Sequence, residues 1–319
     1  MKQLLSFLLV FIIVGTANAQ TNEIIKINWD KTIGGNRNEG GLTSKTFILL
    51  FDSRVYMGGT SNSLANSIKS ESSTNDDYWA YKLEPNSGNI IWENTIKGNN
   101  SDKLTSINSY AFGTALGGIS NSTIGNDKTE NSRGGNDYWI VGVDADGVFN
   151  WDKTFGTNQD DSLVTIIQSA SNTSMLRANL IAAGNTTAGI SGDKTIANKG
   201  GADVWLVEFE TQRRIFPSGW NLTKIRDISI GSIGNDYLKS MLKTDDKGYL
   251  LGIQSNSIFG DRFTDFYGGY DYWLVKLDSN LNIEWQKSYG GSSDDYINQI
   301  LDLDNGNFLL VGTSFSGFS

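Results

Sequence analysis

The sequence contains no cysteine and no histidine among its 319 residues. These absences exclude disulfide bonds, zinc sites built from Cys or His, Ser-His-Asp triads and Cys-His nucleophiles. Any active site would have to use carboxylates, Tyr, Lys, Arg or an oxygen-ligated metal. The chemistry open to this chain is therefore narrow.

Proline and helical periodicity are also scarce. The chain has 2 prolines beside 36 glycines, a composition that predicts many tight turns. No long stretch has apolar residues at helical spacing, whereas short alternating runs rich in Val, Ile, Tyr and Trp recur throughout. The formal net charge of −9 makes nucleic acid and anionic membrane surfaces poor candidate partners. We therefore expect an all-β protein.

The N-terminal residues have the pattern of a secretory signal peptide. Lys2 precedes an apolar run from Leu4 to Val14, and Ala17-Asn18-Ala19 has the small-x-small pattern that signal peptidase cleaves. We expect residues 1–19 to be removed by cleavage near Ala19, which implies a secreted or cell-surface protein. No stretch reaches the roughly eighteen apolar residues that a membrane helix needs, so we expect no membrane span.

An internal repeat is the strongest feature of the rest of the chain. A segment of the Asp-Tyr-Trp type begins four times, and its tryptophans lie 60, 66 and 68 residues apart. The repeated acids and tryptophans are Asp77, Asp137, Asp203 and Asp271 with Trp79, Trp139, Trp205 and Trp273.

The second half of the unit also repeats. It begins at Trp29, Trp92, Trp151 and Trp285, with a degraded copy at Arg226, and a polar turn and two further strand-like runs follow each start. Four short strands in about sixty residues are typical of one blade of a β-propeller. We expect a single domain over residues 20–319, with units at approximately 29–91, 92–150, 151–225, 226–284 and 285–319.

Alternation within the Asp-Tyr-Trp run supports the propeller. Trp273, Val275 and Leu277 lie on one face, and Tyr272 and Leu274 begin the other, so both faces are apolar at one end, as in a sheet packed between neighbours. A lectin-like sandwich would have one polar face, so we favour the propeller over the sandwich. We predict five blades of which the last is incomplete: counted from Trp29, the fifth unit has three strands and exposes Phe308 to Thr313 as an open edge.

These residues also carry a family resemblance. Gly268 to Asp278, followed by Trp285 to Asp295, resembles the bacterial β-propeller repeats of the SBBP and delta-60 type, found in secreted surface proteins of Bacteroidetes. The resemblance covers nearly the whole chain after residue 19. It implies a β-propeller at the cell surface, and it implies no particular activity.

The repeated residues have a structural and a functional interpretation. Tryptophans that recur once per blade are expected to pack between blades rather than to stack on ligands. Asp77, Asp137, Asp203 and Asp271 each stand just before a Tyr-Trp or Val-Trp pair, at the end of a turn, and are expected to accept hydrogen bonds from local backbone amides.

Long polar loops before the Asp-Tyr-Trp segments are the first candidate site. Asp127, Asp193 and Asp261 each lie ten residues before the repeated acid, and each is followed by a base, Lys128, Lys194 or Arg262. One interpretation is a Ca²⁺ or glycan contact repeated around one rim. The favoured one is a solvated ion pair with the adjacent base, since a basic neighbour disfavours cation binding.

The loop from Phe259 to Tyr270 is the second candidate. It contains Phe259, Phe263, Phe266 and Tyr267, more aromatic residues than a solvated loop needs. An exposed shelf for a sugar or a protein partner and local packing on the next blade are equally compatible with the sequence. A third feature, the longer link from Glu210 to Ile225, has the character of a tolerated insertion.

Two functions remain open at this point. The first is a secreted or cell-surface, non-catalytic binding or scaffold module for extracellular glycans or proteins, with no resident cofactor. The second is a carbohydrate-active enzyme that uses carboxylates in the central channel. A hydrolase needs two carboxyls about 5 to 10 Å apart, and the acids of this sequence mostly repeat by blade, which favours the binding module.

Overall fold

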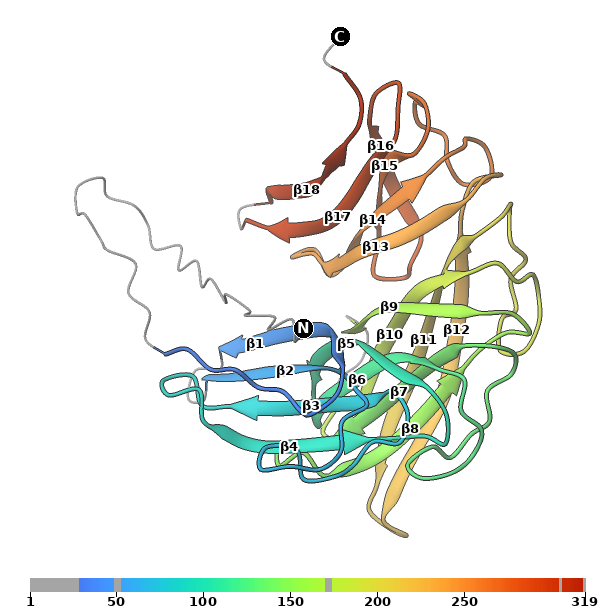
Figure 1. The fold of residues 1–319 in the computed structure, drawn as a ribbon. Coiled ribbons are helices and arrows are strands. Elements are labelled where there is room, and N and C mark those ends of the chain that lie inside the picture. Colours follow the sequence, from blue (N-terminus) through green and yellow to red (C-terminus); the bar gives the residue numbers. More distant parts are fainter. Residues whose placement is uncertain (1–28, 49–52, 170–173, 304–305, 318–319) are drawn as a thin grey trace.

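A computed structural model describes residues 29–48, 53–169, 174–303 and 306–317 of the chain (Figure 1). All regular elements in these residues are β-strands, which confirms the all-β prediction. No helix among them is long and apolar enough to cross a membrane. Residues 1–19, the expected signal peptide, lie outside the described part.

Eighteen strands are defined in the described part of the chain. In chain order they are β1 (Glu39–Ile48), β2 (Ser53–Ser61), β3 (Asp77–Leu83), β4 (Ile90–Ile96), β5 (Asp102–Tyr110), β6 (Gly113–Ser120), β7 (Asp137–Val143), β8 (Phe149–Phe155), β9 (Asp161–Gln168), β10 (Arg177–Thr186), β11 (Asp203–Arg214), β12 (Gly219–Ile230), β13 (Asp236–Lys243), β14 (Tyr249–Ser255), β15 (Asp271–Leu277), β16 (Ile283–Tyr289), β17 (Asp295–Asp302) and β18 (Phe308–Ser314).

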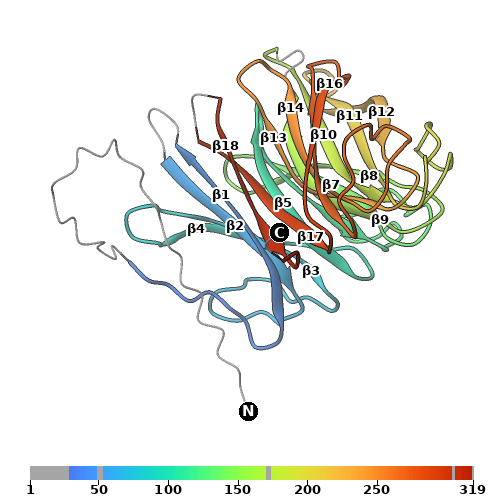
Figure 2. The same ribbon diagram turned by 90° about the horizontal axis from the view of Figure 1, so that it is seen from above.

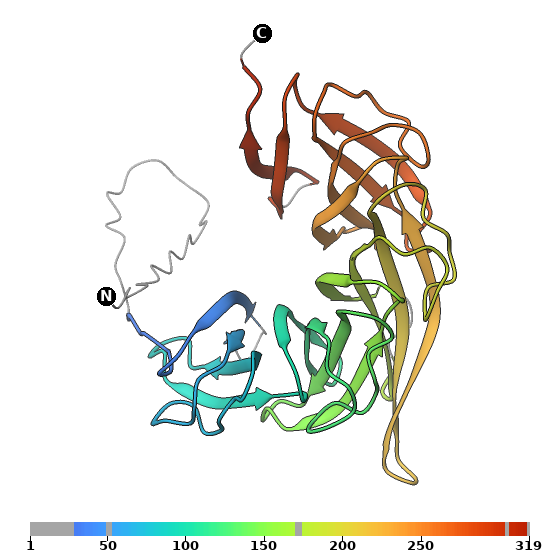
Figure 3. The same ribbon diagram turned by 45° about the vertical axis from the view of Figure 1, so that its right-hand side comes forward.

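The strands form antiparallel meanders of the kind found in propeller blades. β1 to β4, β5 to β8, β9 to β12 and β13 to β16 make four four-stranded sheets, and β17 pairs with β18 in a fifth. The sheets follow one another along an arc whose ends are β1–β4 and β17–β18 (Figure 3). The prediction of a propeller with an incomplete last blade is thus confirmed.

Each sheet presents the same strand to the inside of the arc. The first strands β1, β5, β9, β13 and β17 contact one another in succession. The fourth strands β4, β8 and β12 lie toward the outside, as the views in Figures 1 and 2 show. Consecutive sheets therefore pack face to face, and the core lies in the seams between them.

The Asp-Tyr-Trp strand is buried along most of its length in each sheet. All seven residues of β3 and of β7 are buried. Trp139, Trp205 and Trp273 are fully enclosed, and Trp79 is nearly so. In the second, third and fourth sheets both faces of this strand meet a neighbouring sheet, whereas in the first sheet Trp29 and Ile33 pack against the face that carries Trp79. Burial on both faces is why the sequence is apolar on both sides.

The sheets are out of phase with the sequence units by one strand. The strand that begins each sequence unit pairs with the Asp-Tyr-Trp strand before it: β4 pairs with β3, and β16 pairs with β15. The expectation that Trp285 opens a three-stranded fifth blade is therefore wrong, because Trp285 belongs to the fourth sheet. The fifth sheet has two strands within the described residues.

The link from Glu210 to Ile225 forms a hairpin. It prolongs β11 and β12 beyond the length of their counterparts, and Arg213 pairs with Trp220 near its end. The Trp220 ring lies 5.3 Å from that of Phe112 in the second sheet. The insertion therefore packs on its neighbour, while Phe216 at its tip is exposed.

Candidate functional site

The site candidates all lie on one edge of the sheets, which we call the loop face. There the first and third strands of each sheet begin and the second and fourth end, as the pairings Asp102–Ser120 and Ser120–Asp137 illustrate. The loops between second and third strands cross this edge at residues 62–76, 121–136, 187–202 and 256–270.

A side chain on the fourth strand holds both the repeated tryptophan and the loop. The Trp139 indole Nε1 donates to Asp152 Oδ2 at 3.0 Å, and the Thr129 backbone NH donates to the same oxygen at 3.0 Å. Glu93, Asp227 and Gln286 accept the corresponding indole hydrogen bonds in the other sheets. The repeated tryptophans are thus structural, as their spacing predicts.

The basic residue in each loop points into the protein. Lys128 is 1% exposed, its Nζ donates to Thr154 Oγ1 at 2.9 Å, and it lies 5.1 Å from the centre of the Trp139 ring. Burial lowers the pKa of Lys128 to about 8, although three nearby aspartates oppose the shift. The favoured expectation of solvated ion pairs between adjacent residues such as Asp127 and Lys128 is therefore wrong.

Arg262 replaces lysine in the fourth sheet and makes more contacts. It is fully buried, and its Nη2 lies 3.0 Å from Asp271 Oδ2 and donates to Asp265 O at 2.8 Å. Its Nη1 donates to Ser257 O at 3.0 Å. A five-donor guanidinium thus ties both ends of the loop to the start of β15.

Asp127, Asp193 and Asp261 occupy equivalent places at the seams between sheets. Each accepts a hydrogen bond from a backbone NH at the end of the preceding fourth strand: Lys97 at 2.9 Å, Gly156 at 3.0 Å and Gly231 at 3.1 Å respectively. Their own backbone NH groups donate back to the same three residues. The three acids therefore lie on one edge, and these bonds give each a joining role between sheets.

Two of these acids pair with bases from the preceding loop. Asp193 lies 2.9 Å from Arg133 and Asp261 lies 2.8 Å from Lys199. Within the described residues, no group of three or more Asp or Glu side chains is arranged to hold a metal. The contacts made by these acids are thus cross-sheet hydrogen bonds and ion pairs.

The repeated aspartates cap the loops, as expected. Asp203 accepts from the Lys199 backbone NH at 2.7 Å, and Asp271 accepts from that of Tyr267 at 3.0 Å. Burial raises the pKa of Asp77 and of Asp137 to about 7, and that of Asp203 to about 6. Asp161, the first residue of β9 in the next sheet, lies near Asp137, and its like charge also raises the pKa of Asp137.

The aromatic loop of the fourth sheet differs from its counterparts in what it exposes. Phe259, Phe263, Phe266 and Tyr267 are 60%, 78%, 44% and 45% exposed. Phe263 occupies the place of Thr129, whose hydroxyl bonds to Asp152, and its own NH donates to Gln286. Phe263 thus keeps the backbone hydrogen bond to the fourth strand, while its side chain extends into solvent.

Phe259 has an unusual backbone conformation. Its φ is 66°, in the left-handed region that bulky residues rarely adopt. The equivalent positions, identified by their isolated bridges to the buried base, hold Gly125 and Ser191. A strained phenylalanine that remains well exposed has no evident packing role, and such strain often accompanies binding sites.

Further aromatic residues continue along this face toward β18. The rings of Tyr237 and Tyr270 lie 6.4 Å apart, those of Tyr270 and Tyr296 5.9 Å, and those of Tyr296 and Phe315 5.8 Å. Together with Phe259, Phe263, Phe266 and Tyr267 they form what we call the aromatic face. The Tyr267 hydroxyl donates to Asp265, and the Tyr296 hydroxyl donates to Asp294.

The sequence analysis missed Tyr237, Tyr296 and Phe315. A signal was present: the residue after the first acid of the inner strand is Lys103 in the second sheet and Ser162 in the third, but tyrosine in the fourth and fifth. That comparison becomes readable only once β13 and β17 are known to be equivalent strands.

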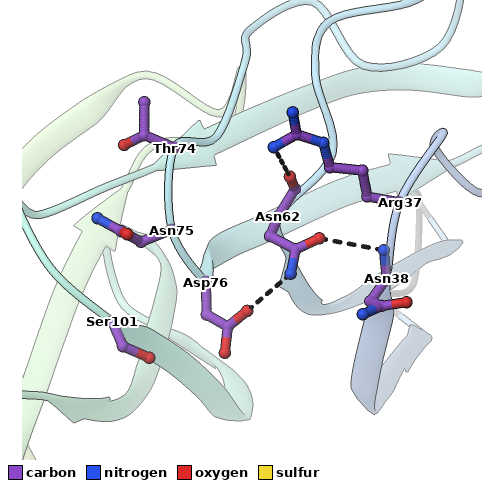
Figure 4. A pocket seen from close by; sticks show the side chains of 7 residues that line it. All are labelled: Arg37, Asn38, Asn62, Thr74, Asn75, Asp76 and Ser101. Atoms are coloured by element: carbon purple, nitrogen blue, oxygen red, sulfur yellow. Dashed lines mark hydrogen bonds between the residues drawn. The ribbon is translucent and has the colours of Figure 1, made fainter.

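A polar pocket of about 600 Å³ opens at the other end of the loop face (Figure 4). Asn62 Oδ1 accepts from the Asn38 backbone NH at 3.1 Å, and Asn62 Nδ2 donates to Asp76 at 3.2 Å. Asn121 and Asn256 make the first of these bonds in their own sheets. The asparagine in this pocket therefore belongs to the repeating framework.

Comparison of the chain with protein-family models and with curated proteins finds no match.

Proposed function

We propose that this protein is a secreted or cell-surface, non-catalytic β-propeller of the SBBP and delta-60 type that binds an extracellular glycan or protein through its aromatic face. The observation that carries the proposal is the group of four exposed aromatic side chains on one loop, Phe259, Phe263, Phe266 and Tyr267. The signal-peptide pattern of residues 1–19 supports the extracellular location.

The loop that presents these rings is preorganised. Arg262, buried beneath it, is tied to Asp271 and Asp265, and its guanidinium lies 5.7 Å from the Phe266 ring. A rigid loop loses little conformational entropy on binding. Exposed rings beside carboxylates and tyrosine hydroxyls can stack on sugar rings and bond to their hydroxyls, which makes a glycan the first ligand class to test.

The carbohydrate-active alternative has less support. Asp137 and Asp161 are a neighbouring carboxyl pair, and both are completely buried at a seam. A polysaccharide cannot reach such a pair, although two accessible carboxyls are what glycoside hydrolysis requires. The same burial holds for Asp203 and Asp236.

A glycan array, run together with a reducing-sugar release assay, tests the proposal. We expect saturable binding to a subset of glycans without sugar release. A triple variant, Phe263→Ser, Phe266→Ser and Tyr267→Ser, should lose at least tenfold in affinity, since three stacking contacts are removed.

The control is Ile124→Ser with Ile190→Ser, which removes exposed apolar side chains from the loops of the second and third sheets. It should bind as the parent does. Equal binding by the triple variant would remove the aromatic face from consideration, and sugar release would favour the enzyme.

A further inference from the structure

Within the described residues, the edge of β18 lacks the pairing with a third strand that the other four sheets have. In each of the four complete sheets the second strand pairs with an Asp-Tyr-Trp strand in one register, with Ser61 opposite Asp77 and Ser255 opposite Asp271. β18 pairs with β17 as β14 pairs with β13, with Ser314 in the place of Ser255. Its other edge carries no strand among the described residues.

The side chains of β18 are exposed where those of its counterparts are buried. Leu309 and Val311 are 45% and 41% exposed, whereas Leu250, the counterpart of Leu309, is fully buried. An exposed apolar strand edge is a template for the addition of another strand.

The Tyr272 hydroxyl identifies what that strand should be. Tyr78 donates its hydroxyl hydrogen to Trp139 O in the next sheet at 2.9 Å, and Tyr138 donates to Trp205 O at 3.2 Å. Tyr272 occupies the same position in the fourth sheet, and its hydroxyl has no hydrogen-bond partner within the described part of the chain. The missing acceptor is the carbonyl of a tryptophan in a third strand of the fifth sheet.

The fifth sheet has a glycine beside the Tyr272 hydroxyl, as the second and third sheets have beside the corresponding tyrosine hydroxyls. A Cβ on Gly118 would lie 2.8 Å from Tyr78 Oη, one on Gly184 2.7 Å from Tyr138 Oη, and one on Gly312 2.1 Å from Tyr272 Oη. The fifth sheet therefore keeps the space that brings a tyrosine hydroxyl to the edge of its second strand.

Among the described residues, Trp285 has no contact that corresponds to the one its counterpart Trp92 makes with the next sheet. Its counterpart Trp92 donates its indole NH to Ala145 O at 3.1 Å and lies against Gly147, both in the turn that follows the third strand of the next sheet. Trp285 is 44% exposed. The turn that would cover it is one that a third strand would bring.

We propose that β18 binds, in antiparallel pairing, an extended polypeptide segment of the Asp-aromatic-Trp-aliphatic class that lies outside residues 29–317. Its Asp pairs opposite Ser314, its Trp pairs opposite Gly312, and the Trp carbonyl accepts the hydrogen bond of Tyr272. The aromatic face ends beside this edge at Phe315, but the proposal rests on strand pairing and on the Tyr272 hydroxyl and does not depend on the proposed function.

The test uses the full chain with a copy of residues 271–278 joined after Ser319 by a flexible linker of about fifteen residues, which gives a millimolar effective concentration. We expect slowed hydrogen exchange of the amides at 308–314 and a higher melting temperature. An identical extension with a scrambled strand is the control. Tyr272→Phe should lower the closure constant of the native extension about threefold to tenfold, and leave the scrambled one unchanged.

No added amide protection at 308–314 relative to the scrambled control would overturn the proposal. So would protection that Tyr272→Phe does not alter. Light scattering on the unextended chain tests whether a second copy of the protein occupies the edge instead. A dimer whose formation protects the amides of 308–314 would show that β18 pairs with β18 of another copy.

Discussion

The indole nitrogen of Trp139 on β7 donates to Asp152 on β8 at 3.0 Å, and the same carboxylate binds both the backbone NH and the hydroxyl of Thr129. One acid thus fixes a core tryptophan and the start of a surface loop. The pair recurs in every complete sheet, with Glu93, Asp227 or Gln286 as the acceptor. This relationship connects the interior of the blade to the loop face.

Replacement of Asp152 should therefore destabilise the protein. Asp152→Ala leaves three donors without their acceptor in a largely buried place, and we expect the free energy of unfolding to fall by about 2 to 4 kcal/mol. Urea denaturation measures the change. Asp146→Ala, at an exposed position in the nearby turn, should alter it by less than about 0.5 kcal/mol. Equal effects of the two variants would contradict the role given to Asp152.

The repeated tryptophan of a third strand, Trp139, should contribute more to stability than that of a fourth strand, Trp285. Trp139→Ala removes a fully enclosed ring and should cost about 3 to 5 kcal/mol. Trp285→Ala removes a ring that is 44% exposed and should cost less than half as much. Thermal melting of both variants tests this difference, and a Trp139→Ala variant that melts like the parent would contradict the blade assignment.

Much of the fold could be predicted from the sequence because each blade repeats the same local pattern. The Asp-Tyr-Trp strand is apolar on both faces, and burial on both faces is what β7 and β11 show. The allocation of strands to sheets could not be predicted in the same way. A repeat can be divided at any point of its period, and only the pairing of β15 with β16 shows that Trp285 closes a sheet.

The roles of the candidate site residues were predicted less well, because tertiary contacts set the direction in which their side chains point. Lys128 follows Asp127 directly, and sequence proximity suggested an ion pair. The loop instead turns so that Lys128 is buried against Trp139 and Thr154 of its own sheet, while Asp127 bonds to Lys97 of the preceding sheet. The exposed aromatic residues were recognised as a group, because four rings in one polar loop are visible without any knowledge of pairing.

Stability should fall as pH rises from 5 to 8. Burial raises the pKa of Asp137 to about 7, against about 3.9 in the unfolded chain, so the folded state holds more protons in between. This contribution is complete below pH 4 and is lost as pH rises through about 7. Asp77 and Asp203 act in the same direction. Melting temperatures across this range measure the slope.

Asp137→Asn isolates the effect of one carboxyl. The amide stays neutral, and it can still accept the backbone hydrogen bond from Arg133. The slope of melting temperature against pH should therefore be shallower than that of the parent. Asp278→Asn serves as the control: hydrogen bonds from Asn282 lower the pKa of Asp278, so it stays ionised throughout the range. A slope that Asp137→Asn leaves unchanged would contradict the assignment.

The strained Phe259 gives a prediction in which stability and binding change in opposite directions. A non-glycine residue at φ 66° carries about 1 to 3 kcal/mol of strain, whereas glycine adopts this conformation freely and costs about 0.5 to 1 kcal/mol through its larger unfolded-state entropy. Phe259→Gly should therefore raise the free energy of unfolding by about 1 kcal/mol, the difference between the midpoints of these two ranges. Because the variant also removes a ring that is 60% exposed, affinity for any ligand of the aromatic face should fall.

Phe263→Gly is the matched comparison. Phe263 is 78% exposed and lies on the same loop, but it is not among the residues with positive φ, so glycine relieves no strain there. This variant should lose ligand affinity and also lose about 0.5 to 1 kcal/mol of stability. Urea denaturation and ligand titration of both variants separate the two effects. A loss of stability in Phe259→Gly as large as that in Phe263→Gly would mean that the Phe259 ring contributes packing that outweighs its backbone strain, and the strain would then be no indication of a binding role.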